Sequence, residues 1–260
     1  MTIVSLLGLI VIGYSRVFVS ASSNLGLQIA SSEEPYKLGE PVPIELRISN
    51  QGSDIIYLSE DSVERIEIQI SSDDRIYKKY SGPGLSFTLD GAGPMFKISP
   101  NGDLKRQKTI LFNFVSHVSH LNVDAAKPVL EGRILTDYAL PKSGTYFIKA
   151  VLEIKDGKPM KVESEPVKVV ISDPVGEDLE VWNKIKDSGD IAYLIQEGDI
   201  LIPSYKAEEQ KKFQQEVEGI IRDYPNSFYA QSLQSSLDKF RASEAKRQEF
   251  MQKLKKQKPQ

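Results

Sequence analysis

The chain has 260 residues, with 33 basic and 36 acidic side chains for a net charge of −3, and 40% of its residues are hydrophobic. This is the composition of a globular chain of one or two domains, and it excludes collagen-like, wholly disordered and polytopic membrane classes. The near balance of charge argues against nucleic-acid binding by the whole chain. Because cysteine is absent, disulfide frameworks, thiolate metal sites, cysteine nucleophiles and bacterial lipoprotein anchors are excluded as well.

The first 21 residues are typical of an export signal. The apolar run Ile3–Ile12 is too short to cross about 30 Å of hydrocarbon as a helix. Val19-Ser20-Ala21 fits the small-x-small preference of a signal peptidase, so we expect a signal peptide over residues 1–21 with cleavage after Ala21. The alternatives are a buried strand or an uncleaved anchor, since no Lys or Arg precedes the run. Cleavage predicts a periplasmic or extracellular protein with no integral membrane span.

Residues 22–172 are expected to be β-rich, because short segments alternate between apolar and polar side chains. The half-polar faces of these segments favour antiparallel sheets packed as a sandwich. No helical pattern of about 10 to 15 residues separates them, which disfavours a parallel, doubly wound sheet. The clearest alternating segments are Leu25–Ile29, Val42–Ser49, Ile66–Ile70, Ile110–Phe114, Tyr146–Ile154 and Val167–Ile171.

Two motifs in this region carry a family resemblance. Tyr36–Val42 with the following Ile44–Asn50 resembles the opening of bacterial immunoglobulin-like domains, and Leu140–Tyr146 resembles the sequence that leads into their penultimate strand. A tyrosine at that place, here Tyr146, is expected to hydrogen-bond through its hydroxyl to the preceding connection. The layout over about residues 25–172 is most similar to the bacterial intracellular proteinase inhibitor family. The resemblance implies an immunoglobulin-like antiparallel β-sandwich and, as one function, protease inhibition.

At Asp173-Pro174 the period changes, and residues 173–260 are expected to form a small α-helical domain. Asp173 is predicted as an N-cap with Pro174 at the first helical position. Leu179, Trp182 and Ile185 are expected to share one helix face. Trp182, the only tryptophan, is expected to pack this helix against the β-rich part rather than to stack on a ligand.

A helical hairpin is predicted at about residues 207–240. Tyr224–Ala230 resembles the inter-helix signature of bacterial periplasmic tetratricopeptide repeats, in which Pro225 ends one helix and Asn226 or Ser227 caps the next. A free solenoid needs at least about three repeats, so a single pair is expected to pack on the sandwich, on the earlier helices or on another protein.

The tail, residues 241–260, carries seven bases against two acids, or +5. A solvated helix end is the first interpretation. Contact with anionic lipid, cell-wall polymer or nucleic acid is the alternative, with nucleic acid the least favoured after export. Phe250, Met251 and Leu254 give the tail a weak face for a partner.

The search for chemistry finds two histidines, His117 and His120. On a helix this spacing would present both to one metal ion, with Asp124 as a third ligand. Strand periodicity runs up to Val115 and no further His or Cys exists, so two loop histidines are expected, with no metal and no cofactor. No serine lies in a Gly-x-Ser-x-Gly elbow and no phosphate-binding glycine motif occurs, so no catalytic residue is predicted.

The sequence therefore predicts a non-catalytic, exported binding protein that acts through an immunoglobulin-like domain on a protein or polysaccharide of the envelope. Long loops on sandwiches often carry recognition, which directs attention to residues 82–94 and 116–137. One alternative is an inhibitor of an extracytoplasmic protease, and a second is a metal-dependent hydrolase. The candidate binding residues are Gly82, Pro83, Phe87, Asp90, His117 and His120.

Overall fold

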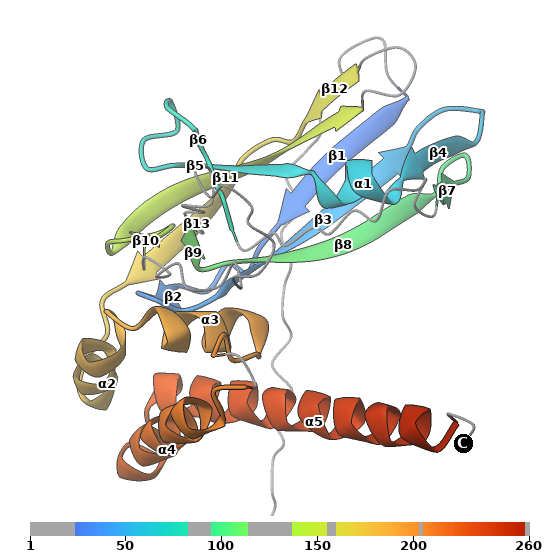
Figure 1. The fold of residues 1–260 in the computed structure, drawn as a ribbon. Coiled ribbons are helices and arrows are strands. Elements are labelled where there is room, and N and C mark those ends of the chain that lie inside the picture. Colours follow the sequence, from blue (N-terminus) through green and yellow to red (C-terminus); the bar gives the residue numbers. More distant parts are fainter. Residues whose placement is uncertain (1–23, 83–94, 114–136, 155–159, 203–204, 258–260) are drawn as a thin grey trace, which may run out of the picture. The chain divides into compact units, whose positions relative to one another are not determined.

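The computed structural model describes residues 24–82, 95–113, 137–154, 160–202 and 205–257 (Figure 1). The predicted signal peptide lies outside these ranges. Contacts divide the chain into a β-rich unit, drawn from residues 1–38, 42–110 and 139–172, and a helical unit, drawn from residues 39–41, 111–138 and 173–260. Among the described residues, 39–41, 111–113 and 137–138 therefore belong, by their contacts, to the helical unit although they interrupt the β-rich sequence.

The first sheet of the β-rich unit has the strand order β1-β3-β8 and is antiparallel throughout. Its strands are β1 (Leu25–Ala30), β3 (Val42–Asn50) and β8 (Asp103–Ile110). The alternation predicted for β3 is confirmed, since Val42, Ile44, Leu46 and Ile48 are each 0% exposed. Burial of such a side chain contributes about 1.5 to 3 kcal/mol, so these four side chains together determine which face of β3 points into the core.

The second sheet has the order β2-β13-β11-β5-β6, with β12 paired to β11 (Figure 1). Only β2 and β13 pair in parallel among these strands. Inward side chains of both sheets form one apolar core, so the unit has two β layers. The expected order, a β-rich part followed by helices, is confirmed. The strands are β2 (Tyr36–Lys37), β5 (Glu67–Ser71), β6 (Lys78–Lys79), β11 (Gly144–Ile154), β12 (Met160–Glu163) and β13 (Val167–Ser172).

One short helix, α1 (Glu60–Glu64), interrupts the β-rich unit and was not expected from the sequence. It follows β4 (Ile56–Ser59), which pairs with β7 (Met95–Ile98) in a two-stranded ribbon. Ser59 caps the start of α1, and the Lys108 ammonium from β8 donates to the carbonyls of Glu64, at 2.7 Å, and Ile66, at 3.0 Å. Burial lowers the pKa of Lys108, and these carbonyls stabilise its charged form.

The hydrogen bond predicted for Tyr146 is confirmed. Its hydroxyl donates to the Lys142 carbonyl at 2.9 Å and accepts from the Lys142 amide at 3.2 Å. The Tyr146 side chain is nearly buried, so both groups of Lys142 are satisfied next to the core. The contact fixes the chain direction where it turns into β11.

Replacing Tyr146 with Phe is expected to lower the free energy of unfolding by about 1 to 2 kcal/mol, because the backbone of Lys142 loses both its donor and its acceptor. Urea denaturation measures this. Tyr57→Phe is the control, because it removes a hydroxyl from a ring that is 57% exposed. Equal stability of the two variants would contradict the assigned role.

The described part of the helical unit contains the helices α2 (Glu177–Ile185), α3 (Gly189–Glu197), α4 (Ala207–Asp223) and α5 (Phe228–Gln257). It also contains β9 (Phe112–Asn113) and β10 (Asp137–Tyr138), which pair antiparallel. The prediction that Asp173 caps the first helix was wrong. Helix α2 starts only after Gly176, whose φ of 58° and ψ of −133° are not helical, and Pro174 is buried ahead of it.

Ser227 occupies the N-cap position of α5, as predicted for Asn226 or Ser227, and its carbonyl accepts from the Gln231 amide at 3.0 Å. A contact that was not predicted adds to this cap. The Asp178 carboxylate of α2 accepts from the Phe228 amide at 2.7 Å and from the Ser227 hydroxyl at 2.9 Å. A carboxylate at the positive end of a helix is favourable, so this contact ties α2 to the start of α5.

Trp182 is 8% exposed and packs against rings of the helical unit itself, whereas its expected packing against the β-rich part stays a prediction. Its ring meets Tyr138 edge-on at a centroid distance of 5.1 Å and stacks on Tyr229 at 5.7 Å. Burial raises the pKa of both tyrosines, which stay protonated. The predicted helix face was wrong in one member, because Leu179 is 44% exposed while Val181 is 0% exposed. The face is therefore shifted toward Val181, Trp182 and Ile185.

Gly39 leaves room for this ring. Its φ is +78°, and a Cβ atom on it would lie 2.0 Å from Cζ3 of Trp182. Gly39→Ala is expected to lower the free energy of unfolding by more than Gly176→Ala, with a difference of at least about 1 kcal/mol. Gly176 also has a positive φ but nothing within 4 Å of its Cβ position. The Gly176→Ala variant therefore measures the cost of backbone strain without a steric clash. Thermal melting of both variants measures the difference, and equal losses would contradict this packing.

Within the described residues, none of the helices combines the length and the apolar character that crossing a membrane requires.

Candidate functional site

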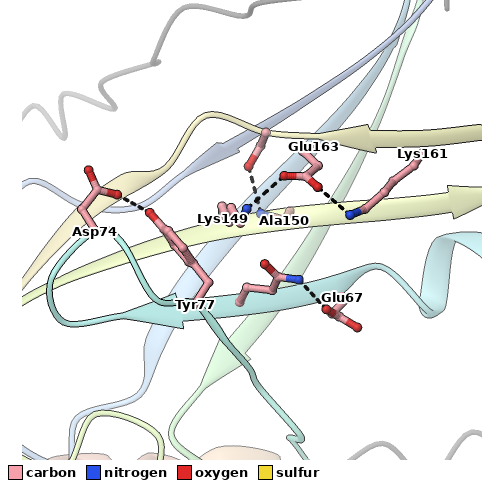
Figure 2. A network of polar contacts seen from close by, with 9 residues as sticks. Glu67, Asp74, Tyr77, Lys149, Ala150, Lys161 and Glu163 are labelled. Atoms are coloured by element: carbon pink, nitrogen blue, oxygen red, sulfur yellow. Dashed lines mark hydrogen bonds and ion pairs between the residues drawn. The ribbon is translucent and has the colours of Figure 1, made fainter. Parts of the chain in front are cut away.

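The outward face of the second sheet carries a connected set of polar side chains (Figure 2). Register places Lys149 of β11 opposite Gln69 of β5, and Val151 opposite both Glu67 and Glu163. Since residues opposite each other share a face, these side chains point to the same side of the sheet. We call this set the charged face, and its members are Glu67, Gln69, Tyr77, Lys79, Lys149, Lys161 and Glu163.

Glu163 is the centre of the charged face. One of its carboxylate oxygens lies 2.9 Å from the Lys149 ammonium and the other lies 2.6 Å from that of Lys161 (Figure 2). These two hydrogen bonds lower the pKa of Glu163, and the pairing raises the pKa of Lys161. Glu163 and Lys161 are therefore charged at neutral pH.

Tyr77 extends the charged face to the loop between β5 and β6. The Lys149 ammonium lies 4.6 Å from the centroid of the Tyr77 ring, a cation–π contact, and the Tyr77 hydroxyl donates to Asp74. Burial, followed by the bond to Asp74, raises the pKa of Tyr77. Lys149 thus lies between an aromatic ring and a carboxylate, which leaves its side chain 20% exposed.

Asp73 stabilises the loop between β5 and β6 through hydrogen bonds to its carboxylate. One oxygen of its carboxylate accepts from the Ser71 hydroxyl at 2.8 Å, the Arg75 amide at 2.9 Å and the Ile76 amide at 3.0 Å. The two backbone amides lower the pKa of Asp73 most. This arrangement presents Ile76, which is 70% exposed, at the tip of an ordered loop beside Tyr77.

Glu67 forms the other end of the charged face. Its carboxylate accepts from the Gln69 side-chain amide at 2.6 Å and pairs with Lys79 at 2.9 Å, and both contacts lower the pKa of Glu67. Beneath these charges Val151 is only 2% exposed. Ser164 fixes the backbone next to it, because its hydroxyl accepts from the Ala150 amide and its own amide donates to the Ala150 carbonyl, both at 2.9 Å.

These pKa directions decide what the charged face does chemically. A general acid or base works best with a pKa near the working pH, whereas these carboxyls are held below their ordinary range. The Lys161 ammonium is held protonated, so it is a poor nucleophile. The charged face thus presents fixed charges beside an aromatic ring.

Of the sequence-predicted binding residues, the structure describes only Gly82, which is not a member of the charged face. Pro83, Phe87, Asp90, His117 and His120 lie outside the described residues. Gly82 is half-buried, and a Cβ atom on it would lie 2.5 Å from Cε1 of Tyr80. Gly82 therefore packs beside that ring. Across the described ranges, no three histidine, cysteine or acidic side chains are grouped so that they could hold a metal ion.

The charged face was not predicted from the sequence, which located β5 and β11 but not β12, the strand that carries Lys161 and Glu163. Glu67 and Gln69 alternate with Ile66, Ile68 and Ile70 along the strand. This alternation predicts that the two polar side chains face outward and the isoleucines face the core. The pairing of Glu67 with Val151 joins positions far apart in the chain. Only the strand register supplies that information.

No protein-family model matches the chain, and no curated protein matches it either. Among solved structures, one determined by the Northeast Structural Genomics Consortium is 10% identical, with a TM-score of 0.31, over 58% of this chain and 90% of that chain. A beta-glucosidase from Listeria innocua in complex with glucose is also 10% identical, with a TM-score of 0.22, over 54% of this chain and 16% of that enzyme. Such low scores indicate neither a shared fold nor a shared activity.

The pairing of Glu163 predicts a pH-dependent contribution to stability. Because its pKa is lowered from the ordinary 4.5 in the folded chain, the contribution is present above that value and is lost as the pH falls through the folded pKa. Glu163→Gln is expected to lower the free energy of unfolding by about 0.5 kcal/mol at neutral pH, since the pairs are partly exposed. The loss should shrink progressively between about pH 5 and about pH 2.

Urea denaturation over this pH range measures the difference. Glu34→Gln is the matched control, because Glu34 is exposed and lies in the connection between β1 and β2, outside the strands that carry the charged face. A deficit of Glu163→Gln that stayed constant down to the lowest pH would contradict an origin in the charged carboxylate.

Proposed function

We propose that this chain is a non-catalytic, exported interaction protein that binds a protein or polysaccharide of the cell envelope through the charged face. The observation that carries the proposal is the double pairing of Glu163 with Lys149 and Lys161, beside the Tyr77 ring. The hydrogen-bond donors, the acceptors and the aromatic ring of the charged face are already oriented before a ligand binds. Preorganisation of this kind lowers the cost of ordering side chains on binding.

The strand order supports an immunoglobulin-like sandwich as the scaffold. One sheet runs β1-β3-β8, the other contains β13-β11-β5, and the Tyr146 hydroxyl makes the expected bond near the start of β11. Export is supported by the apolar run and the Val19-Ser20-Ala21 site in the sequence.

Inhibition of an extracytoplasmic protease is a second candidate function, and the loop between β5 and β6 favours it. A protease inhibitor needs a rigid, protruding segment, and Asp73 holds the Arg75 and Ile76 amides while both side chains stay exposed. The metal-dependent hydrolase depends on His117 and His120, which lie outside the described residues, so it stays a prediction from the sequence.

Site-specific photocrosslinking in cells tests the proposed function. A photoreactive phenylalanine analogue at Ile76 lies next to the charged face without replacing one of its members, and the same analogue at Gln107 reports on the exposed outer face of the other sheet. We expect a discrete adduct from position 76, no corresponding adduct from position 107, and loss of the adduct when Lys149→Glu is added.

The adduct also separates the candidate functions. Sensitivity to protease or to glycosidases identifies a protein or a polysaccharide ligand. A protease as the adduct, together with inhibition that Arg75→Ala abolishes, would favour the second candidate. Adducts of equal yield at both positions, or an adduct that survives Lys149→Glu, would overturn the role of the charged face.

A further inference from the structure

The C-terminal half of α5 differs from its N-terminal half in what it contacts. Tyr229, Leu233, Leu237 and Phe240 are at most 4% exposed and pack within the helical unit. From Arg241 to Lys253 every residue is exposed except Glu244, which is half-buried. Figure 1 shows this part of α5 extending beyond α4. We call residues 241–257 the C-terminal arm.

The arm is strongly basic. It holds six bases, Arg241, Lys246, Arg247, Lys253, Lys255 and Lys256, against the two acids Glu244 and Glu249, which gives a net charge of +4. The whole chain, in contrast, has a net charge of −3. Positive charge is therefore concentrated on this one helical segment.

Apolar side chains lie among these bases. Phe250 is 60% exposed and Met251 is 49% exposed. Residues three and four apart are neighbours on a helix, so Lys246 and Lys253 both flank Phe250 on its side of the arm. An exposed aromatic ring flanked by two ammonium groups suits the boundary between lipid headgroups and acyl chains.

The acids of the arm do not hold its bases in place. Lys253 pairs with Glu249 at 2.7 Å and Arg247 with Glu244 at 3.4 Å, but the side chains of the first pair are 68% and 65% exposed and Arg247 is 59% exposed. Solvated pairs of this kind contribute little, so either base is available to an anionic surface at small cost.

We propose that the C-terminal arm docks on an anionic lipid surface, lying along the headgroups with Phe250 inserted toward the acyl chains. The positive charge of the arm indicates an anionic surface as its partner, because each basic side chain near anionic lipid strengthens the attraction to it. The exposed Phe250 and Met251 favour lipid over nucleic acid, because a phosphate backbone offers no apolar phase for them. This docking is independent of the charged face on the other unit.

Co-sedimentation of the full chain with vesicles tests the proposal. Phosphatidylcholine vesicles with and without phosphatidylglycerol serve as probes, at low and at high salt. We expect binding to the anionic vesicles that weakens with salt. The N-terminal apolar run is common to all variants, so any binding that it causes appears equally in each.

Two double variants with the same change in net charge make the comparison. Lys246→Glu with Lys253→Glu is expected to weaken binding at least about twentyfold, whereas Lys211→Glu with Lys212→Glu, on an exposed part of α4, leaves it within about twofold. F250W provides a second measurement, since its emission should shift to the blue with anionic vesicles only. Equal losses in both double variants, no shift for F250W, or tighter binding to nucleic acid than to vesicles would overturn the proposal.

Discussion

Burial of the inward side chains of two sheets against each other is the interaction on which the β-rich unit depends. Ile44, Leu46, Ile148 and Leu152 are 0% exposed and belong to one core. Each such side chain contributes about 1.5 to 3 kcal/mol, whereas an exposed ion pair contributes at most about 1 kcal/mol. The core therefore determines where the strands lie, and the positions of the strands determine which charged side chains can pair.

This order of energies explains how the charged face is organised. In a strand, a buried neighbour on either side forces the residue between to face outward, as Ile148 and Ala150 do for Lys149. The register of β11 against β5 and β12 then sets which charges meet. The core already holds the backbone, so the ion pairs of the charged face add little to the stability of the fold. Their side chains are nevertheless held in fixed positions, as the recognition function proposed for the charged face requires.

The sequence predicted elements whose cause is local. Alternation located β3, β5 and β11, and the Leu140–Tyr146 motif predicted a hydrogen bond that the Tyr146 hydroxyl makes. Contacts that depend on a distant residue were not predicted. Asp178 of α2 adds to the cap of α5, and the charged face joins strands that are far apart in the chain, so neither follows from a local pattern. The candidate binding loops were chosen by length alone, and residues 83–94 and 116–136 lie outside the described ranges.

The central claim is that a ligand covers the charged face, and lysine footprinting tests it most directly. Lys79 and Lys161 of the charged face have side chains that are 67% and 54% exposed, and Lys105 on the other sheet matches them at 56%. An amine-reactive acylating reagent is applied to intact cells and to the purified protein. The account predicts lower labelling of Lys79 and Lys161 in cells and unchanged labelling of Lys105. Equal labelling of all three lysines in both samples would contradict it.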